Sequence, residues 1–300
     1  MQDFRLKVFL TAAKTLNFTR CAEQLNISQP AVSRHISELE SYYGTKLFSR
    51  QASRIELTES GRILEQWSGR ILSMYMQLEH EIGIAGKAVK GQLRIGASTT
   101  IAQYILPPVI ARFRTCYPDI TITLNSANSQ KIELDLLSQN IDLGFVENLS
   151  RRSGLNYRHF ADDRLVVATS SASPLNGTYS LKHILQMPMV VREKGSGTLE
   201  LMSRRFSEAG YSLSAFNIVS SLGSSEAIKS YLKASNAITI ISMAAIRNEL
   251  RDNSLKIIEI KGINLDREFC YATCHGEQHT LANRFINFAI NSIYHSDNEG

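Results

Sequence analysis

Apolar residues recur along this chain with two different periods, and the change of period divides the chain into three regions. Up to residue 43 the apolar positions lie three or four residues apart, which is the spacing of one face of a helix. The same spacing continues without proline from residue 58 to residue 87. From residue 92 onward, short apolar runs alternate with helical segments. We therefore expect a helical domain over 1–58, a single long helix over 59–88 and an α/β domain over 89–300.

The segment over residues 17–58 predicts a winged helix-turn-helix. Its first helix, capped by Thr19, ends at Asn26, because Asn tolerates the left-handed conformation that a tight turn needs. Ser28 is suited to cap the next helix, and Pro30 to enter its first turn, where a missing N–H costs nothing. An apolar stripe predicts the buried side of this second helix and consists of Val32, Ile36, Leu39 and Tyr43.

Polar side chains on the opposite face of this second helix carry donors with the reach that base edges and phosphates require. The hairpin that follows places two arginines beside its tip, where they suit phosphate contacts. A merely solvated helix face is the alternative, but the first helix, the turn and the basic hairpin together favour binding to double-stranded DNA. The predicted DNA-binding residues are Ser28, Gln29, Pro30, Ser33, Arg34, Arg50 and Arg54.

The long helix over 59–88 carries an apolar stripe with successive spacings of four, four, three and four residues. A helix between two domains has no core of its own, so a second copy of the chain would bury the stripe. Packing onto the same chain is the alternative. The predicted dimerisation residues are Ile63, Trp67, Ile71, Met74 and Leu78.

The composition favours a polyanionic partner and argues against a membrane protein. The net charge is +5 and the pI is near 9.0, although a cationic surface is not unique to DNA-binding proteins. No apolar run approaches the length of a membrane span, and the N-terminus lacks a signal-peptide pattern, so we expect a cytoplasmic protein without a membrane partner. The sequence contains no G-x-S-x-G elbow, Walker loop or H-E-x-x-H motif, so catalysis is a weaker hypothesis than DNA binding.

The four cysteines are scattered, which argues against a disulfide framework. Cys270, Cys274 and His275 form the one cluster that resembles a set of metal ligands. They lie in an apolar, strand-like stretch without a second ligand pair, so burial as small hydrophobic residues is the favoured interpretation. We therefore expect neither a metal nor another cofactor.

Beyond residue 92 the alternation of strand-like and helical segments is typical of an α/β domain with largely parallel sheets. The length of this region favours two lobes over one. The predicted strands are Leu93–Ala97, Thr121–Ser126, Asp142–Val146, Leu165–Thr169, Met189–Arg192, Asn217–Ser220, Ile238–Ile241, Lys256–Ile260 and Glu268–Ala272.

Four of these strand ends run straight into small, hydroxyl-rich segments that open helices. Free N–H groups at a helix N-terminus, Ser and Thr hydroxyls, and the close approach that Gly permits all suit a small anion or carboxylate. Ligands of open α/β sheets bind beyond the carboxyl ends of the strands. Ordinary N-capping is the alternative for each segment taken alone. The predicted effector-binding residues are Ser98, Thr99, Thr100, Ser129, Ser196, Gly197, Thr198 and Ser224.

The run AEQLNISQPAVSRHISELE over residues 22–40, with GTKLFSR over 44–50 and LTESG over 57–61, resembles the N-terminal domain of LysR-type transcriptional regulators. The resemblance is dense over about the first sixty residues and looser beyond them. It implies that the second helix contacts operator DNA and that the long helix is a dimerising linker, often within a homotetramer rather than a homodimer. It also implies a periplasmic-binding-protein-like pair of lobes, lobe I over 92–161 and 268–300 and lobe II over 162–267.

The segment REKGSGT over residues 192–198 resembles the version found in LysR regulators of sulfur assimilation and carbon fixation. The effectors of those regulators are small anions or phosphorylated metabolites. Leu199 stands where the resemblance leads us to expect a basic residue. The sequence therefore predicts a transcriptional regulator controlled by a small anionic or carboxylate effector. A ligand-independent DNA-binding protein whose C-terminal domain serves only oligomerisation is the alternative.

Overall fold

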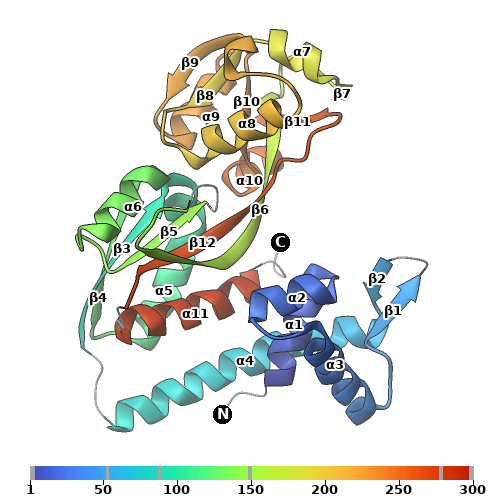
Figure 1. The fold of residues 1–300 in the computed structure, drawn as a ribbon, viewed down its shortest axis with the longest axis vertical. Helices are drawn as coiled ribbons and strands as arrows, with labels where there is room; N and C mark the ends of the chain where they lie inside the picture. Colours follow the sequence, from blue (N-terminus) through green and yellow to red (C-terminus); the bar gives the residue numbers. More distant parts are fainter. Residues whose placement is uncertain (1–3, 52–53, 87–89, 148–150, 277–279, 297–300) are drawn as a thin grey trace. The chain divides into compact units, whose positions relative to one another are not determined.

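The computed structural model describes residues 4–51, 54–86, 90–147, 151–276 and 280–296 (Figure 1). The chain forms two compact units. One comprises residues 1–90 with 113–119 and 287–300, and the other comprises residues 91–112 and 120–286.

Three helices and a hairpin form the winged helix-turn-helix at the start of the first unit: α1 (Phe4–Thr15), α2 (Phe18–Leu25), α3 (Gln29–Tyr43), β1 (Phe48–Gln51) and β2 (Arg54–Leu57). Between α2 and α3, Asn26 adopts the left-handed conformation with φ 53°, as predicted. The Ser28 hydroxyl accepts a hydrogen bond from the Ala31 N–H, which confirms it as the cap of α3. The core is apolar and includes Val8, Phe9, Cys21, Val32, Ile36 and Leu39.

Two expectations for this motif are wrong. The cap of α2 is Asn17, not Thr19, because the Asn17 side chain accepts the N–H groups of Thr19 and Arg20 and the helix begins at Phe18. Tyr43 does not continue the buried stripe, because it lies in the last turn of α3, where its ring is exposed and contacts the ring of Tyr42.

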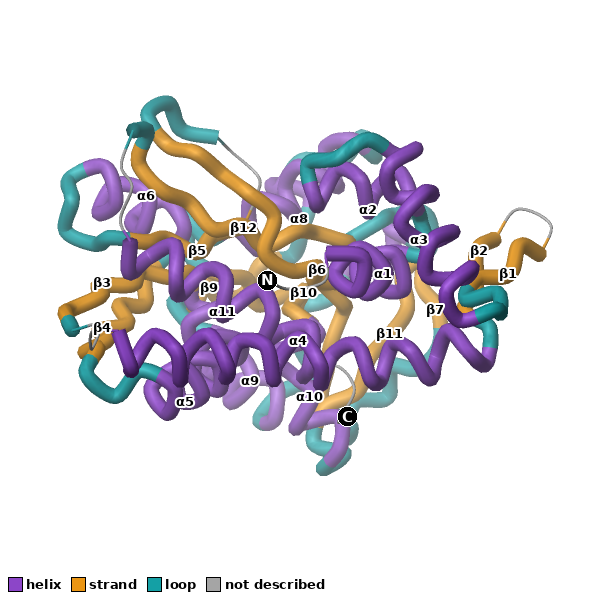
Figure 2. Tube along the Cα trace, turned by 90° about the horizontal axis from the view of Figure 1, so that it is seen from below, coloured by secondary structure: helices purple, strands orange, loops and turns teal. Residues whose placement is uncertain are grey.

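The linker helix α4 (Glu59–Gly86) runs as one uninterrupted helix (Figure 2). Leu64 and Leu72 are buried in the apolar core that α1 shares, so one side of α4 packs onto its own chain. Residues 87–88 of the predicted linker lie outside the described part of the chain.

The second unit contains a sheet with the strand order β4-β3-β5-β12-β6-β10-β8-β9, and β11 and β7 lie off this path. The long strand β6 pairs with β12 through its first half and with β10 and β11 through its second half (Figure 1). The first half of β6 therefore belongs to one lobe of the domain and its second half to the other. The strands are β3 (Gly91–Ser98), β4 (Ile120–Ala127), β5 (Leu143–Glu147), β6 (Leu155–Ser170), β7 (Thr178–Tyr179), β8 (Met189–Arg192), β9 (Ile218–Leu222), β10 (Ile238–Ser242), β11 (Leu255–Ile260) and β12 (Asp266–Cys274).

The sheet is mixed rather than largely parallel. β3 runs parallel to β4 and β5, and β8 runs parallel to β9 and β10, but β6 and β12 are antiparallel to their partners. The first half of β6, residues 155–164, is missing from the predicted strands. Its positions alternate between buried and exposed and contain no apolar run, so its strand conformation depends on pairing with β12.

Helices connect most of these strands, and several of them begin directly at a strand end. They are η1 (Ile101–Ile105), α5 (Leu106–Cys116), α6 (Ser129–Leu137), α7 (Leu181–Gln186), α8 (Gly197–Glu208), η2 (Leu213–Ala215), α9 (Ser225–Lys233), α10 (Met243–Arg251) and α11 (Thr280–Ser296). Within the described ranges, no helix is both long enough and apolar enough to cross a membrane. All four cysteines lie in the described part of the chain and none forms a disulfide, and the described residues hold no group of three His, Cys, Asp or Glu side chains suited to a metal ion.

Candidate functional site

The outer face of α3 presents the predicted DNA-binding side chains to solvent. Gln29, Pro30 and Arg34 are exposed, and the Arg34 side chain retains 80% of its accessible surface. Gln29 Nε2 donates to Ser33 Oγ over 2.9 Å, and Arg34 Nε donates to Glu38 Oε1 over 2.9 Å. These contacts orient the polar groups along the face of the helix that is free of the apolar core. The hydroxyl oxygen of Ser28 is committed to the cap.

The carboxylate of Glu40 joins the recognition helix α3 to the wing. It accepts the N–H groups of Leu47 and Phe48 over 2.9 and 3.4 Å, and Lys46 Nζ donates to it over 2.6 Å. Although burial of Glu40 acts to raise its pKa, these hydrogen bonds outweigh burial and hold the pKa below its ordinary value. The wing hairpin is antiparallel. The side chains of Arg50 and Arg54, its two predicted phosphate contacts, lie outside the described part of the chain.

The predicted dimerisation stripe of α4 is mostly solvent-exposed within the chain. Trp67 exposes 52% of its surface, and Ile63, Met74 and Leu78 expose about as much or more. Ile71 is the exception, because it is partly buried against the apolar core of the winged helix-turn-helix. Large apolar side chains at four positions of one helix therefore remain uncovered in the monomer.

Seven of the eight predicted effector-binding residues are buried at the junctions where strands lead into helices. Ser98 ends β3, and Thr99 and Thr100 lead into η1. Ser129 is the first residue of α6, and Ser196 precedes Gly197 and Thr198 at the start of α8. Each of these seven is at least nine-tenths buried.

Ser224 differs from the other seven. Its hydroxyl accepts the N–H of Ala227 and caps α9, and among the described residues no hydrogen bond links it to the polar contacts described below. Ordinary N-capping, the alternative to effector binding, therefore accounts for Ser224.

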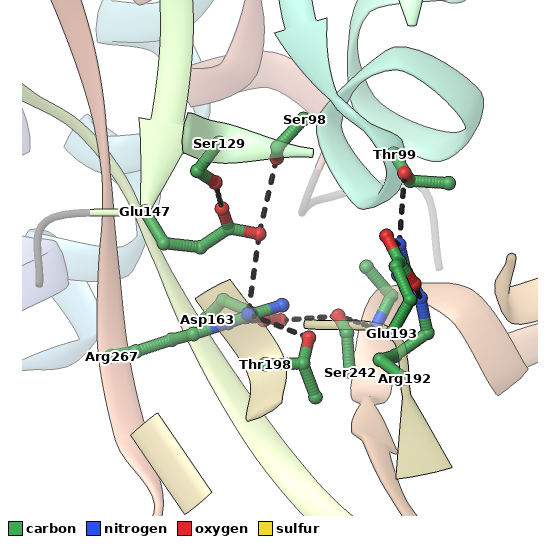
Figure 3. A network of polar contacts seen from close by, with 11 residues as sticks. Ser98, Thr99, Ser129, Glu147, Asp163, Arg192, Glu193, Thr198, Ser242 and Arg267 are labelled. Atoms are coloured by element: carbon green, nitrogen blue, oxygen red, sulfur yellow. Dashed lines mark hydrogen bonds and ion pairs between the residues drawn. The ribbon is translucent and has the colours of Figure 1, made fainter. Parts of the chain in front are cut away.

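The carboxylate of Glu147 lies where three of these junctions meet (Figure 3). Glu147 ends β5, and its side chain is 3% exposed. Ser98 Oγ donates to it over 3.1 Å, and Ser129 Oγ donates at closer range. A Cβ on Gly197 would lie 2.6 Å from Glu147 Oε2, so the carboxylate approaches the start of α8 as only glycine permits.

The guanidinium of Arg267, from β12, reaches the same carboxylate. Its Nη1 donates to Glu147 Oε1 over 3.3 Å and to Thr198 Oγ1 over 3.1 Å. Its Nε donates to Asp163 on β6 over 2.7 Å. The third nitrogen, Nη2, is buried and has no hydrogen-bond partner in the part of the chain that the structure describes. A buried N–H without an acceptor is costly, so this donor lacks the hydrogen bond that its burial calls for.

A second guanidinium, that of Arg192 at the end of β8, lies on the side of Thr99 (Figure 3). Arg192 is buried, and its Nη2 donates to Thr99 Oγ1 over 3.0 Å. Nε and Nη2 also bind the two carboxylate oxygens of Glu193 over 2.8 and 3.0 Å. Unlike Glu147, Glu193 is partly exposed, so solvent screens its interaction with the guanidinium more strongly.

A cavity of about 220 Å³ adjoins Glu147. Its lining carries three glutamates and one arginine, and burial raises the pKa of Glu133, one of these glutamates. Its charge is therefore opposite to that of the guanidinium side of the network. The residues that line it are Ser129, Gln130, Glu133, Glu147, Arg152, Gly195, Gly197 and Glu200.

Sequence reasoning identified the hydroxyls of this network but not its charges. Glu147 and Arg192 directly follow buried apolar runs, and a charge at the carboxyl end of a buried strand is a signal that could have identified both. Arg267 and Asp163 lie in strands with alternating burial and carry no such signal. Ser242, which donates to Asp163 and caps α10, is a further hydroxyl at a helix start that the predicted set lacks.

Comparison with known proteins adds two family matches. Residues 4–62 match the description "Bacterial regulatory helix-turn-helix protein, lysR family", and residues 86–292 match "LysR substrate binding domain". Among curated relatives, the HTH-type transcriptional regulator CysL of Bacillus subtilis is 32% identical over 269 residues, 89% of each chain.

Two solved structures share the fold. The regulatory domain of CcmR from Synechocystis PCC6803, solved in complex with 2-PG, superposes with a TM-score of 0.63 at 25% identity and covers 69% of this chain and 99% of its own. Full-length CbnR, solved in complex with its target DNA, superposes with a TM-score of 0.56 at 22% identity and covers 97% of this chain and all of its own.

Proposed function

Since this chain belongs to the LysR family of transcriptional regulators, we propose that a small anionic effector, bound between the two C-terminal lobes, controls its binding to operator DNA. The observation that carries the proposal is the junction of hydroxyls and guanidiniums around Thr99, Thr198, Arg192 and Arg267. Each guanidinium contacts a threonine hydroxyl of another element, Arg192 that of Thr99 and Arg267 that of Thr198, and Arg267 Nη2 lacks a partner among the described residues. This donor set suits a carboxylate, a sulfur oxyanion or a phosphate.

Thr100 and Ser196 complete the proposed site. Both are buried at helix starts, and neither side chain caps its own helix. Their hydroxyls are therefore not committed to the capping role that would explain them without a ligand. The complex of the related CcmR domain with 2-PG supports a small ligand in this kind of domain.

We assign operator contact to the exposed face of α3, with Gln29, Pro30, Ser33 and Arg34 reading the major groove and Arg50 and Arg54 on the phosphates. Two copies joined through the exposed stripe of α4 would present two such helices to an inverted repeat, as a homodimer or within a homotetramer. A cytoplasmic location belongs to the same proposal, because it is consistent with binding to operator DNA.

The effector proposal is tested on the full chain. Thermal shift identifies which of sulfate, sulfite, thiosulfate, phosphorylated sugars and small carboxylates stabilises the protein, and calorimetry then gives the dissociation constant. Thr100→Ala and Ser196→Ala should weaken that binding about tenfold each, the loss expected for a hydrogen bond to a charged group. Ligand-free DNA binding should remain intact. Unchanged titrations would remove both residues from the site.

The alternative is a ligand-independent DNA-binding protein whose C-terminal domain serves only oligomerisation. The same screen separates the two, because the alternative predicts no stabilisation by any small molecule and no change of operator affinity on its addition. A ligand that binds without changing the operator affinity would also favour the ligand-independent alternative. A regulatory ligand must bind the DNA-bound and the free protein with different affinity.

A further inference from the structure

Glu147 already occupies part of the donor set that the sequence predicted for an external carboxylate. Its oxygens accept from Ser98 at the end of β3, from Ser129 at the start of α6 and from Arg267 on β12. Its carboxylate also lies against the backbone of Gly197 at the start of α8. A side chain of the protein therefore makes the contacts that a bound anion would make.

The charges around Arg267 also indicate that Glu147 takes the place of a bound anion. Two buried carboxylates, those of Glu147 and Asp163, bind this single guanidinium. Both carboxylates and the guanidinium are more than nine-tenths buried as side chains, so solvent screens their interactions only weakly. An external anion near Arg267 would meet two like charges, and like charges that share a buried site oppose each other strongly.

We propose that Glu147 is a tethered competitor of the effector's anionic group and thereby sets the affinity and selectivity of the effector site. The proposal rests on the proposed function. The hydroxyls of Ser98 and Ser129 and the Nη1 of Arg267 become available to an anion only when the Glu147 carboxylate moves away. The buried Nη2 of Arg267 has no acceptor among the described residues and is a further donor for that anion. Weak or generic anions are thus excluded, and only an effector with further contacts displaces Glu147.

The competition between Glu147 and an external anion is tested with sulfate and acetate. These probes can be used before the effector is identified. Full-length wild type, Glu147→Gln and Glu147→Ala are titrated with each anion by calorimetry and thermal shift, at constant ionic strength maintained with chloride. Asp142→Asn is the matched control, because the Asp142 carboxylate, whose side chain is 9% exposed, is ion-paired to Arg94 just before the opposite end of β5.

Glu147→Ala should bind sulfate about tenfold more tightly than the wild type, or better, because it removes both the competing acceptor and the like charge. Glu147→Gln should gain less, since its amide oxygen can still accept from Ser98 and Ser129. Asp142→Asn should bind as the wild type does. Adding Ser98→Ala to Glu147→Ala should reverse part of the gain, which locates the bound anion at this junction.

Equal sulfate and acetate affinities in the wild type and both Glu147 variants would overturn the competitor role. If the wild type still bound an anion with an affinity that Thr100→Ala lowers, the effector site itself would stand. If no variant bound any anion, both the competitor role and the anionic effector would be rejected. Glu147→Gln preserves the size of the side chain, so the result remains interpretable if Glu147→Ala unfolds.

Discussion

The backbone of Gly197 lies so close to the carboxylate of Glu147 that a Cβ at position 197 would fall 2.6 Å from Oε2 and 2.7 Å from Cδ. Real Cβ atoms do not approach side chains this closely. Glycine at position 197 is therefore a packing requirement of the buried acid, independent of any role in ligand binding.

Gly197→Ala should accordingly destabilise the C-terminal domain by about 1–3 kcal/mol, the usual cost of overpacking a filled interior. Denaturant unfolding measures the change. Adding Glu147→Ala should recover part of the loss, because Oε2 and Cδ are removed while the Cβ of residue 147, at 2.8 Å, remains. Strict additivity of the two single changes would contradict a direct contact between these residues.

Arg34→Ala should reduce affinity for the operator about tenfold while changing binding to unrelated DNA less, if Arg34 reads a base edge. Fluorescence anisotropy with a site selected from a random-sequence pool measures both affinities. Glu38→Gln is the matched control, because it releases Arg34 from its ion pair while keeping the guanidinium. An equal loss on both DNAs would move Arg34 to the phosphates.

Trp67→Glu should shift the protein toward smaller assemblies, because it places a charge in the middle of the exposed apolar stripe of α4. Sedimentation velocity over a concentration series measures the shift. Gln66→Glu, an exposed neighbour on the same helix, introduces the same charge outside the stripe and should leave the assembly unchanged. If the two variants sedimented alike, the stripe would not be the interface.

Acid should loosen the winged helix-turn-helix through Glu40. Because its folded pKa lies below its ordinary value, Glu40 contributes stability above the unfolded pKa, and that contribution is lost as the pH falls through the folded pKa. Glu40→Gln should therefore be less stable near neutral pH and lose less stability on acidification. Trp67, the one tryptophan of the chain, reports unfolding of this unit by fluorescence during denaturant titrations from pH 6 to 3. Parallel pH profiles for wild type and variant would contradict this role.

The class of the protein could be read from local patterns. The αL residue Asn26, the cap Ser28 and the stripe through Val32, Ile36 and Leu39 depend only on neighbours a few positions away, and all were predicted. The single long helix after the wing follows from the same short-range periodicity. The Asn17 cap was missed because two nearby residues could serve, and the packing of Phe18 on the core decides between them.

The proposed effector site contains contacts that local sequence patterns do not predict. Hydroxyls at helix starts were predicted because a cap and the strand before it are adjacent in sequence. The pairing of Glu147 with Arg267 joins residues 120 positions apart, and it exists only because β12 returns antiparallel between β5 and β6. The sequence by itself determined a LysR-type regulator with a hydroxyl-rich sensor. Only the tertiary structure decided which charged side chains contact those hydroxyls. Pairing between strands distant in sequence positions these charges, and no local sequence period encodes that pairing.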